Sequence, residues 1–150
     1  MLSLWMFTSL GLWCAAADAM ALTVTVMRVP KQKANMAAKA QAIPKVYCRL
    51  FAADKAKSFP MQGKDAQVSL EVVPQEDKAV CVFPNIRNGD YAVSVYYDTN
   101  GNGTFDRTFF GYPKEPWGVS RSKGRFKTPS FKDAMFTVTD KNRSIVVELR

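Results

Sequence analysis

The stretch from Asp98 to Asp106 carries side chains whose types and spacing imply a definite chemistry. It reads Asp-Thr-Asn-Gly-Asn-Gly-Thr-Phe-Asp, with oxygen-bearing side chains at alternate positions and a glycine, Gly103, in the sixth place. Loops that wrap calcium have this pattern, because the ion prefers oxygen ligands and the chain must turn sharply at the glycine. The stretch therefore predicts a calcium site.

The predicted ligands contribute side-chain or backbone oxygens: Asp98, Asn100, Asn102, Thr104, Asp106 and Glu115. Glu115 is included because the last position of such a loop, which normally supplies a carboxylate, is Phe109 here. Water could complete the calcium shell instead, and Asp133, further along the chain, is another candidate for the missing carboxylate. Two carboxylates with two amides predict a weak site, with a Kd of about 10⁻⁵ to 10⁻³ M. A metal-free turn is the alternative, since Asn-Gly pairs are also strong hairpin signals.

Short alternating apolar segments surround this loop and must position it. They are residues 22–29, 45–51, 67–73, 80–83, 92–97, 134–138 and 144–149. Turn residues recur between them, which favours an all-β fold, an antiparallel Greek-key β-sandwich of about seven strands. The segment 92–97 delivers the chain directly into Asp98. Tyr91, two places after Gly89, resembles the tyrosine corner of such sandwiches and should point into the core.

Composition limits the functional classes. The chain has 150 residues, 47% of them hydrophobic, which suits one domain with a real core. It has no histidine, which excludes His-activated nucleophiles and imidazole-bound metals. A net charge of +8 favours anionic partners, although solubility alone also explains it.

The N-terminal residues 1–19 are almost uncharged and end in Ala17-Asp18-Ala19, which predicts a signal peptide cleaved before Met20. A retained anchor is the alternative. Residues 20–150 would then form a single periplasmic or secreted domain without a membrane span, and we expect a monomer. In an oxidising compartment, Cys48 and Cys81, both in strand-like segments, are predicted to form a disulfide across the core; buried free thiols are the alternative.

Residues 107–132 combine seven basic side chains with one acidic residue, Glu115, and with interleaved aromatic side chains. The predicted ligand surface consists of Lys114, Trp117, Arg121, Arg125 and Phe126. Aromatic faces beside cations suit an anionic polysaccharide, a glycan or another envelope component, and nucleic acid is the least expected ligand. The alternative is that the aromatic side chains only pin a long loop onto the sandwich.

Three motifs carry a resemblance to a known family. They are the Gly89-x-Tyr91 strand running into D-x-N-x-N-G-x-x-D, the segment G-x-P-K-E-P-x-G at 111–118, and G-R-F-x-x-P-S-F at 124–131. With them the chain resembles an uncharacterised, domain-of-unknown-function family of exported bacterial proteins. The resemblance implies a β-sandwich similar to transthyretin-like or carboxypeptidase-regulatory modules, with no established activity. This chain departs from it in a basic insert after the first strand and in Tyr97, where relatives should have histidine.

Two functional hypotheses follow. The first is a non-catalytic binding or structural module of the cell envelope that calcium stabilises. The second is a small hydrolase in which Glu115 and Asp133 act as acid and base. They differ in geometry, because catalysis requires the two carboxylates to converge in a concave site.

Overall fold

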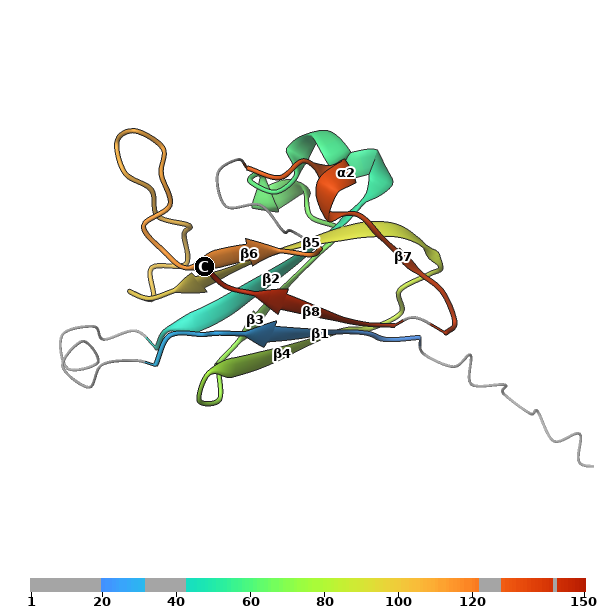
Figure 1. The fold of residues 1–150 in the computed structure, drawn as a ribbon, viewed down its shortest axis with the longest axis horizontal. Coiled ribbons are helices and arrows are strands. Elements are labelled where there is room, and N and C mark those ends of the chain that lie inside the picture. The colour runs from blue at the N-terminus through green and yellow to red at the C-terminus, as the bar shows by residue number, and fades with distance from the viewer. Residues whose placement is uncertain (1–19, 32–42, 122–127, 142) are drawn as a thin grey trace, which may run out of the picture.

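The described residues fold into two β-sheets packed face to face. The structure is a computed structural model, and it describes residues 20–31, 43–121, 128–141 and 143–150. Figure 1 shows the two sheets with short helices above one of them. The predicted signal peptide, most of the basic insert, and Arg125 and Phe126 lie outside the described residues.

Eight strands and three short helical segments make up the described fold. They are β1 (Leu22–Met27), β2 (Lys45–Ala52), η1 (Ala53–Ser58), η2 (Gly63–Asp65), β3 (Val68–Val72), β4 (Lys78–Phe83), β5 (Gly89–Asp98), β6 (Trp117–Val119), α2 (Phe131–Ala134), β7 (Phe136–Val138) and β8 (Ser144–Glu148). One sheet has the order β4-β1-β8, and the other has β3-β2-β5-β6, with β7 also paired to β5. The predicted all-β sandwich is confirmed.

Alternation along the strands explains the core. In β1 and β4 every second residue is buried, which directs one face of that sheet inward. The inward side chains of β5, from Tyr91 to Tyr97, join the same core cluster. The tyrosine corner is present, because the Tyr91 hydroxyl donates a hydrogen bond to the carbonyl oxygen of Arg87 over 3.1 Å.

The two cysteines lie on facing strands of different sheets, Cys48 on β2 and Cys81 on β4. Their sulfur atoms are bonded, the Cα atoms are 6.5 Å apart, and both side chains are fully buried. The predicted disulfide is therefore present in this structure, and it joins the two sheets across the core.

The outer face of the β2-β5 sheet carries a second, smaller core. Phe59 lies at its centre and makes edge-to-face contacts with Phe51 of β2 and with Phe131 of α2. Three features differ from the sequence-based expectation: the short strand β6, the helix α2, and the parallel pairing of β8 with β1. β6 has only three residues, too few for a periodic pattern.

β5 carries the site. It is the longest strand, ten residues from Gly89 to Asp98, and β2 pairs with it along one edge. On its other edge, β7 pairs near Gly89 and β6 pairs near Tyr96. Because β5 is held on both edges, the end at which Asp98 stands is fixed in position.

Candidate functional site

Asp98 ends β5 and organises the loop that follows. Its side chain is 1% exposed, and its Oδ1 atom accepts hydrogen bonds from the backbone N–H groups of Gly101 over 2.7 Å and Asn102 over 3.2 Å. Its Oδ2 atom accepts a third, from the N–H of Gly103 over 2.7 Å. Gly101 and Gly103 have φ values of 71° and 76°, which glycine adopts without a steric penalty. The loop is therefore wrapped around one buried carboxylate.

Asp106 is the meeting point of the polar side chains in the loop. The Nδ2 atom of Asn100 donates to it over 2.7 Å, and the Nδ2 atom of Asn102 donates to both of its oxygens over 3.1 and 3.2 Å. Thr104 adds a longer bond through its hydroxyl, 3.4 Å. The hydrogen bonds from Asn100 and then Asn102 lower the pKa of Asp106 below its ordinary value. Asp106 thus carries a full negative charge at neutral pH.

Glu115 reaches the same loop from the chain segment that returns to β6. Its Oε1 atom accepts from the N–H of Thr99 over 3.0 Å and its Oε2 atom from the N–H of Asp106 over 3.1 Å. The side chain is 4% exposed. Burial raises the pKa of Glu115 above its ordinary value, the two backbone hydrogen bonds oppose that rise, and the nearby charge of Asp98 adds to it.

The loop concentrates negative charge. Among the described residues, no lysine or arginine forms an ion pair with Asp98, Asp106 or Glu115. Lys45 lies opposite Asp98 in the β2-β5 register, but its Nζ atom binds Glu71 over 2.8 Å. The carboxylates are not gathered around one point: in the described part of the chain, no three acidic or cysteine side chains are arranged to hold a metal ion.

An aromatic cluster packs the loop onto the outer face of the sheet. The ring of Phe105 lies 5.2 Å from that of Tyr96, which stacks on Tyr47 at 4.8 Å. The Tyr96 hydroxyl donates to the carbonyl oxygen of Gly103 over 3.4 Å, and the Arg49 guanidinium lies 4.9 Å from the Tyr96 ring centroid. Burial raises the pKa of Tyr96 to about 12. Alternation along a strand predicts which of its side chains share a face of the sheet, but it did not identify these residues as part of the site.

A short hairpin follows the loop, and we call residues 107–113 the aromatic arm. Arg107 and Pro113 form an isolated antiparallel bridge at its base, and the N–H of Thr108 donates to the carbonyl oxygen of Tyr112 over 2.8 Å. The N–H of Gly111 closes a turn onto the carbonyl oxygen of Thr108 over 2.9 Å. Figure 1 shows the loop and arm, in yellow and orange between β5 and β6, projecting beyond the sandwich.

The predicted ligand surface is only partly assembled. Lys114 is exposed, but Trp117 is half-buried, packs against the second core cluster, and is covered by the Arg150 guanidinium 4.7 Å from its ring centroid. Arg121 is exposed and donates to the carbonyl oxygen of Met135 over 3.3 Å. Arg125 and Phe126 lie outside the described residues.

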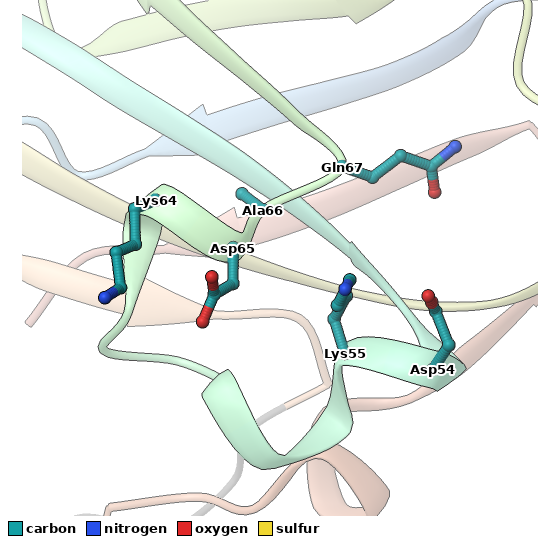
Figure 2. Close-up of a pocket in the computed structure, with 6 residues that line it drawn as sticks. All are labelled: Asp54, Lys55, Lys64, Asp65, Ala66 and Gln67. Carbon is teal, nitrogen blue, oxygen red and sulfur yellow. The ribbon is translucent and has the colours of Figure 1, made fainter.

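The two carboxylates of the hydrolase hypothesis have separate structural roles. Asp133 caps α2: its Oδ2 atom accepts from the N–H and the hydroxyl of Ser130 over 2.9 and 2.7 Å. Glu115 has both oxygens on backbone N–H groups of the loop. A surface depression of about 470 Å³ contains neither of them. Figure 2 shows its lining, which comes from η1 and from η2 and the residues after it: Asp54, Lys55, Lys64, Asp65, Ala66 and Gln67.

The fold and the site together define a disulfide-bonded β-sandwich module with a polar, acidic loop at one end of its central strand. The chain belongs to the family described as "Uncharacterized protein conserved in bacteria (DUF2141)", whose model matches residues 39–146. The expected family is thereby confirmed. No curated protein and no solved structure matches the chain. No helix among the described residues is long and apolar enough to cross a membrane.

Proposed function

We propose that this protein is an exported, non-catalytic module that binds an anionic component of the bacterial cell envelope, and that a calcium ion stabilises its loop at 98–106. The observation that carries the calcium proposal is the charge at the loop. Asp98, Asp106 and Glu115 contribute three carboxylates, and no described basic side chain forms an ion pair with them, although the charge of Lys114 acts on Asp106 from nearby. Asp98 and Glu115 are buried, and buried charge is costly unless a cation offsets it.

The residues at the loop fit calcium better than other metals. Calcium accepts carboxylate, amide and backbone carbonyl oxygens, so it does not need three converging carboxylates. The chain has no histidine, and Cys48 and Cys81 are bonded to each other, which removes the usual ligands of zinc and copper among the described residues. Asn100, Asn102, Thr104, Asp106 and Glu115 would supply the oxygens, with Asp98 at the start of the loop.

Charge, disulfide and family support the envelope assignment. A structural disulfide is typical of proteins outside the cytoplasm, and the family occurs in bacteria. The net charge of +8 favours an anionic partner such as an acidic polysaccharide, a glycan or a headgroup layer. The positions of Glu115 and Asp133 also agree with a binding role rather than a catalytic one. Glu115 accepts hydrogen bonds from backbone N–H groups of the loop, and Asp133 accepts one from the N–H of Ser130 at the start of α2, so each carboxylate has a structural role.

The thermal midpoint in excess calcium and in excess chelator tests the calcium site. At calcium concentrations 100 times the Kd, binding adds about 2.7 kcal/mol, which raises the midpoint by roughly 5 to 10 °C. The informative variant is Asp106→Asn, which removes charge and keeps shape. Asp98→Ala is less informative because it also removes three backbone hydrogen bonds.

A matched control is Asp54→Asn, which removes an exposed carboxylate from η1, outside the loop. We expect the calcium-dependent rise in wild type and in this control, and its loss in Asp106→Asn. Equal midpoints of wild type in calcium and in chelator would reduce the loop to a metal-free turn. Expression of the full sequence, followed by intact mass of the extracytoplasmic fraction, tests export, with a start at Met20 as the expected result.

A further inference from the structure

The tip of the aromatic arm exposes large apolar side chains. Phe109 is 99% exposed, Phe110 82% and Tyr112 71%. The two phenylalanine rings contact each other edge to face, with centroids 5.6 Å apart. Clusters of exposed aromatic side chains of this kind mark interaction sites, because apolar surface in contact with water is unfavourable unless a partner covers it.

These aromatic side chains are not needed to shape the arm. The turn is set by backbone hydrogen bonds between Thr108 and Gly111 and between Thr108 and Tyr112. The Thr108 hydroxyl accepts from the N–H of Tyr112 over 3.1 Å, and Gly111 takes the φ of 83° that the turn needs. The expectation that the aromatic residues only pin this segment onto the sandwich is therefore wrong for Phe109, Phe110 and Tyr112.

Basic residues flank the tip. Arg107 stands at the base, with its guanidinium 5.3 Å from the Phe105 ring centroid and in contact with the sulfur of Met61. Lys114 is exposed on the other side of the base, and residues 107–114 contain no acidic side chain. An acidic residue borders this segment at each end. Asp106 accepts hydrogen bonds from Asn100 and Asn102, and Glu115 is buried and accepts from two backbone N–H groups.

We infer that the aromatic arm docks this protein on a lipid bilayer with anionic headgroups, with Phe109, Phe110 and Tyr112 entering the headgroup region and Lys114 contacting the anionic surface. This deepens the proposed envelope-binding function and rests on it. A projecting tip fits a soft surface, whereas sugars are usually bound in a concave site. Two depressions on the described surface, one lined by residues of η1 and η2 and one by residues between Val72 and Val80, contain no residue of the arm. Phenylalanine with tyrosine beside basic residues is the composition of interfacial anchors.

The arm is held in a fixed direction relative to the sandwich. The N–H of Lys114 donates to the carbonyl oxygen of Asp106 over 2.9 Å, and Glu115 binds the N–H of Asp106. The base of the arm and the calcium-binding candidate are thus one hydrogen-bonded unit. Because the base is already ordered, little conformational entropy is lost there when the tip enters the bilayer.

Vesicle flotation tests the inference. The full sequence is expressed, and protein from the extracytoplasmic fraction is mixed with phosphatidylcholine vesicles that contain about a third phosphatidylglycerol, in calcium and in chelator. We expect the wild type to float with these vesicles. The double variant Phe109→Ser and Phe110→Ser should lower the partition coefficient by about 10-fold or more, because two phenylalanine side chains no longer leave water.

Two further variants separate the contributions. Lys114→Gln should lower binding to anionic vesicles by about 5-fold and leave binding to pure phosphatidylcholine unchanged. The matched control is Val80→Ser with Val82→Ser, which removes two half-exposed apolar side chains from β4. This control should bind vesicles like the wild type, since β4 lies at the edge of the opposite sheet.

Insertion of the tip has its own readout. Phe110→Trp places a fluorophore at the tip, and its emission relative to the wild type should shift to shorter wavelength with anionic vesicles and be quenched by brominated lipid. An unshifted emission alongside flotation would overturn the inference, because binding would then be by charge alone. Retained flotation of the Phe109 and Phe110 double variant would overturn it as well.

The outcomes also separate this inference from the proposed function. Wild type that shows the calcium-dependent thermal rise but does not float with anionic vesicles overturns the bilayer inference and leaves the calcium site intact. Tip-dependent binding to a soluble polyuronate without flotation would assign the arm to a glycan and overturn the bilayer. Tip-dependent flotation with no calcium effect on the midpoint would support the bilayer inference while contradicting the calcium proposal.

Discussion

The buried carboxylate of Glu115 accepts a hydrogen bond from the backbone N–H of Asp106 over 3.1 Å, and so ties the return limb of the aromatic arm to the end of the acidic loop. The other oxygen of Glu115 binds the N–H of Thr99, at the start of the loop. One side chain therefore spans the loop from its first residues to its last. A ligand that moves Glu115 would therefore act on both the loop and the base of the arm.

Asp98→Ala is expected to destabilise the protein even in chelator. The substitution leaves three backbone N–H groups of the loop without their acceptor, and hydrogen bonds to a charged group are worth about 1.5 to 3 kcal/mol each. We predict a loss of about 3 kcal/mol in urea unfolding, since water satisfies part of the exposed loop. Asn100→Ala, which removes an exposed side chain, is the control and should change stability far less. Equal unfolding midpoints for the two variants would contradict this role of Asp98.

Replacing both Cys48 and Cys81 by alanine removes the link between the sheets. The bridge closes a loop with a sequence separation of 33 residues, and the chain-entropy estimate for such a loop is about 3 to 4 kcal/mol. Urea unfolding of the double variant measures this loss. Alkylation of the unreduced wild type under denaturing conditions should leave both cysteines unlabelled, and labelling of either would show that the bridge does not form.

Tyr91→Phe removes the hydroxyl of the tyrosine corner and keeps the ring in the core. The bond to the carbonyl oxygen of Arg87 is lost, with an expected decrease in unfolding free energy of about 1 kcal/mol. Tyr112→Phe is a matched control, because that tyrosine is 71% exposed at the tip of the arm. If both variants unfold at the wild-type denaturant concentration, the corner bond contributes nothing.

Gly118→Ala should be strongly destabilising, because a Cβ atom at this position would overlap the backbone carbonyl oxygen of Glu148 and lie 3.1 Å from Cγ1 of Val147. Backbone cannot move aside as a flexible side chain can, so we expect a loss of about 2 kcal/mol or more. Gly111→Ala provides the comparison: its Cβ would meet no neighbour, and only the left-handed φ penalty of about 1 kcal/mol applies. A smaller effect at Gly118 than at Gly111 would show that β6 and β8 do not pack this closely.

Tyr96 gives a prediction for alkaline pH, measured in chelator. Burial favours its neutral phenol and raises the pKa from 10 to about 12. A raised folded pKa means that the stabilising contribution is complete below the unfolded pKa and is lost as pH rises through about 12. The unfolding free energy should therefore fall between pH 10 and 12, less steeply in Tyr96→Phe. Burial also raises the pKa of Tyr47 and Tyr97, so the readout is the difference in phenolate absorbance between the folded wild type and Tyr96→Phe. This difference should show a tyrosine titrating near pH 12, and its absence would contradict the burial of Tyr96.

Much of the fold could be predicted from the sequence because the strands obey a local rule. Alternation of apolar and polar residues locates β1, β2 and β4 to within a few residues, since one face of each lies on the main core. β5 is instead recognisable as a run of strand-forming residues, and it is buried on both faces. β6 and α2 could not be found this way. Each is too short to repeat a pattern. β6 forms because it pairs with β5, and α2 forms where Phe131 and Ala134 pack into the second core cluster.

The candidate site was half predictable for the same reason. The spacing of Asp98, Asn100, Asn102 and Asp106 is local, so the sequence determined that an acidic, glycine-containing loop follows a buried strand. That Glu115 lies against this loop, and that Trp117 is packed while Phe109 and Phe110 stand in solvent, depends on contacts between distant segments. Composition cannot distinguish an aromatic ring that fills a core from one that is presented to a partner, because both are equally apolar, and only the tertiary structure decides which of them has neighbours.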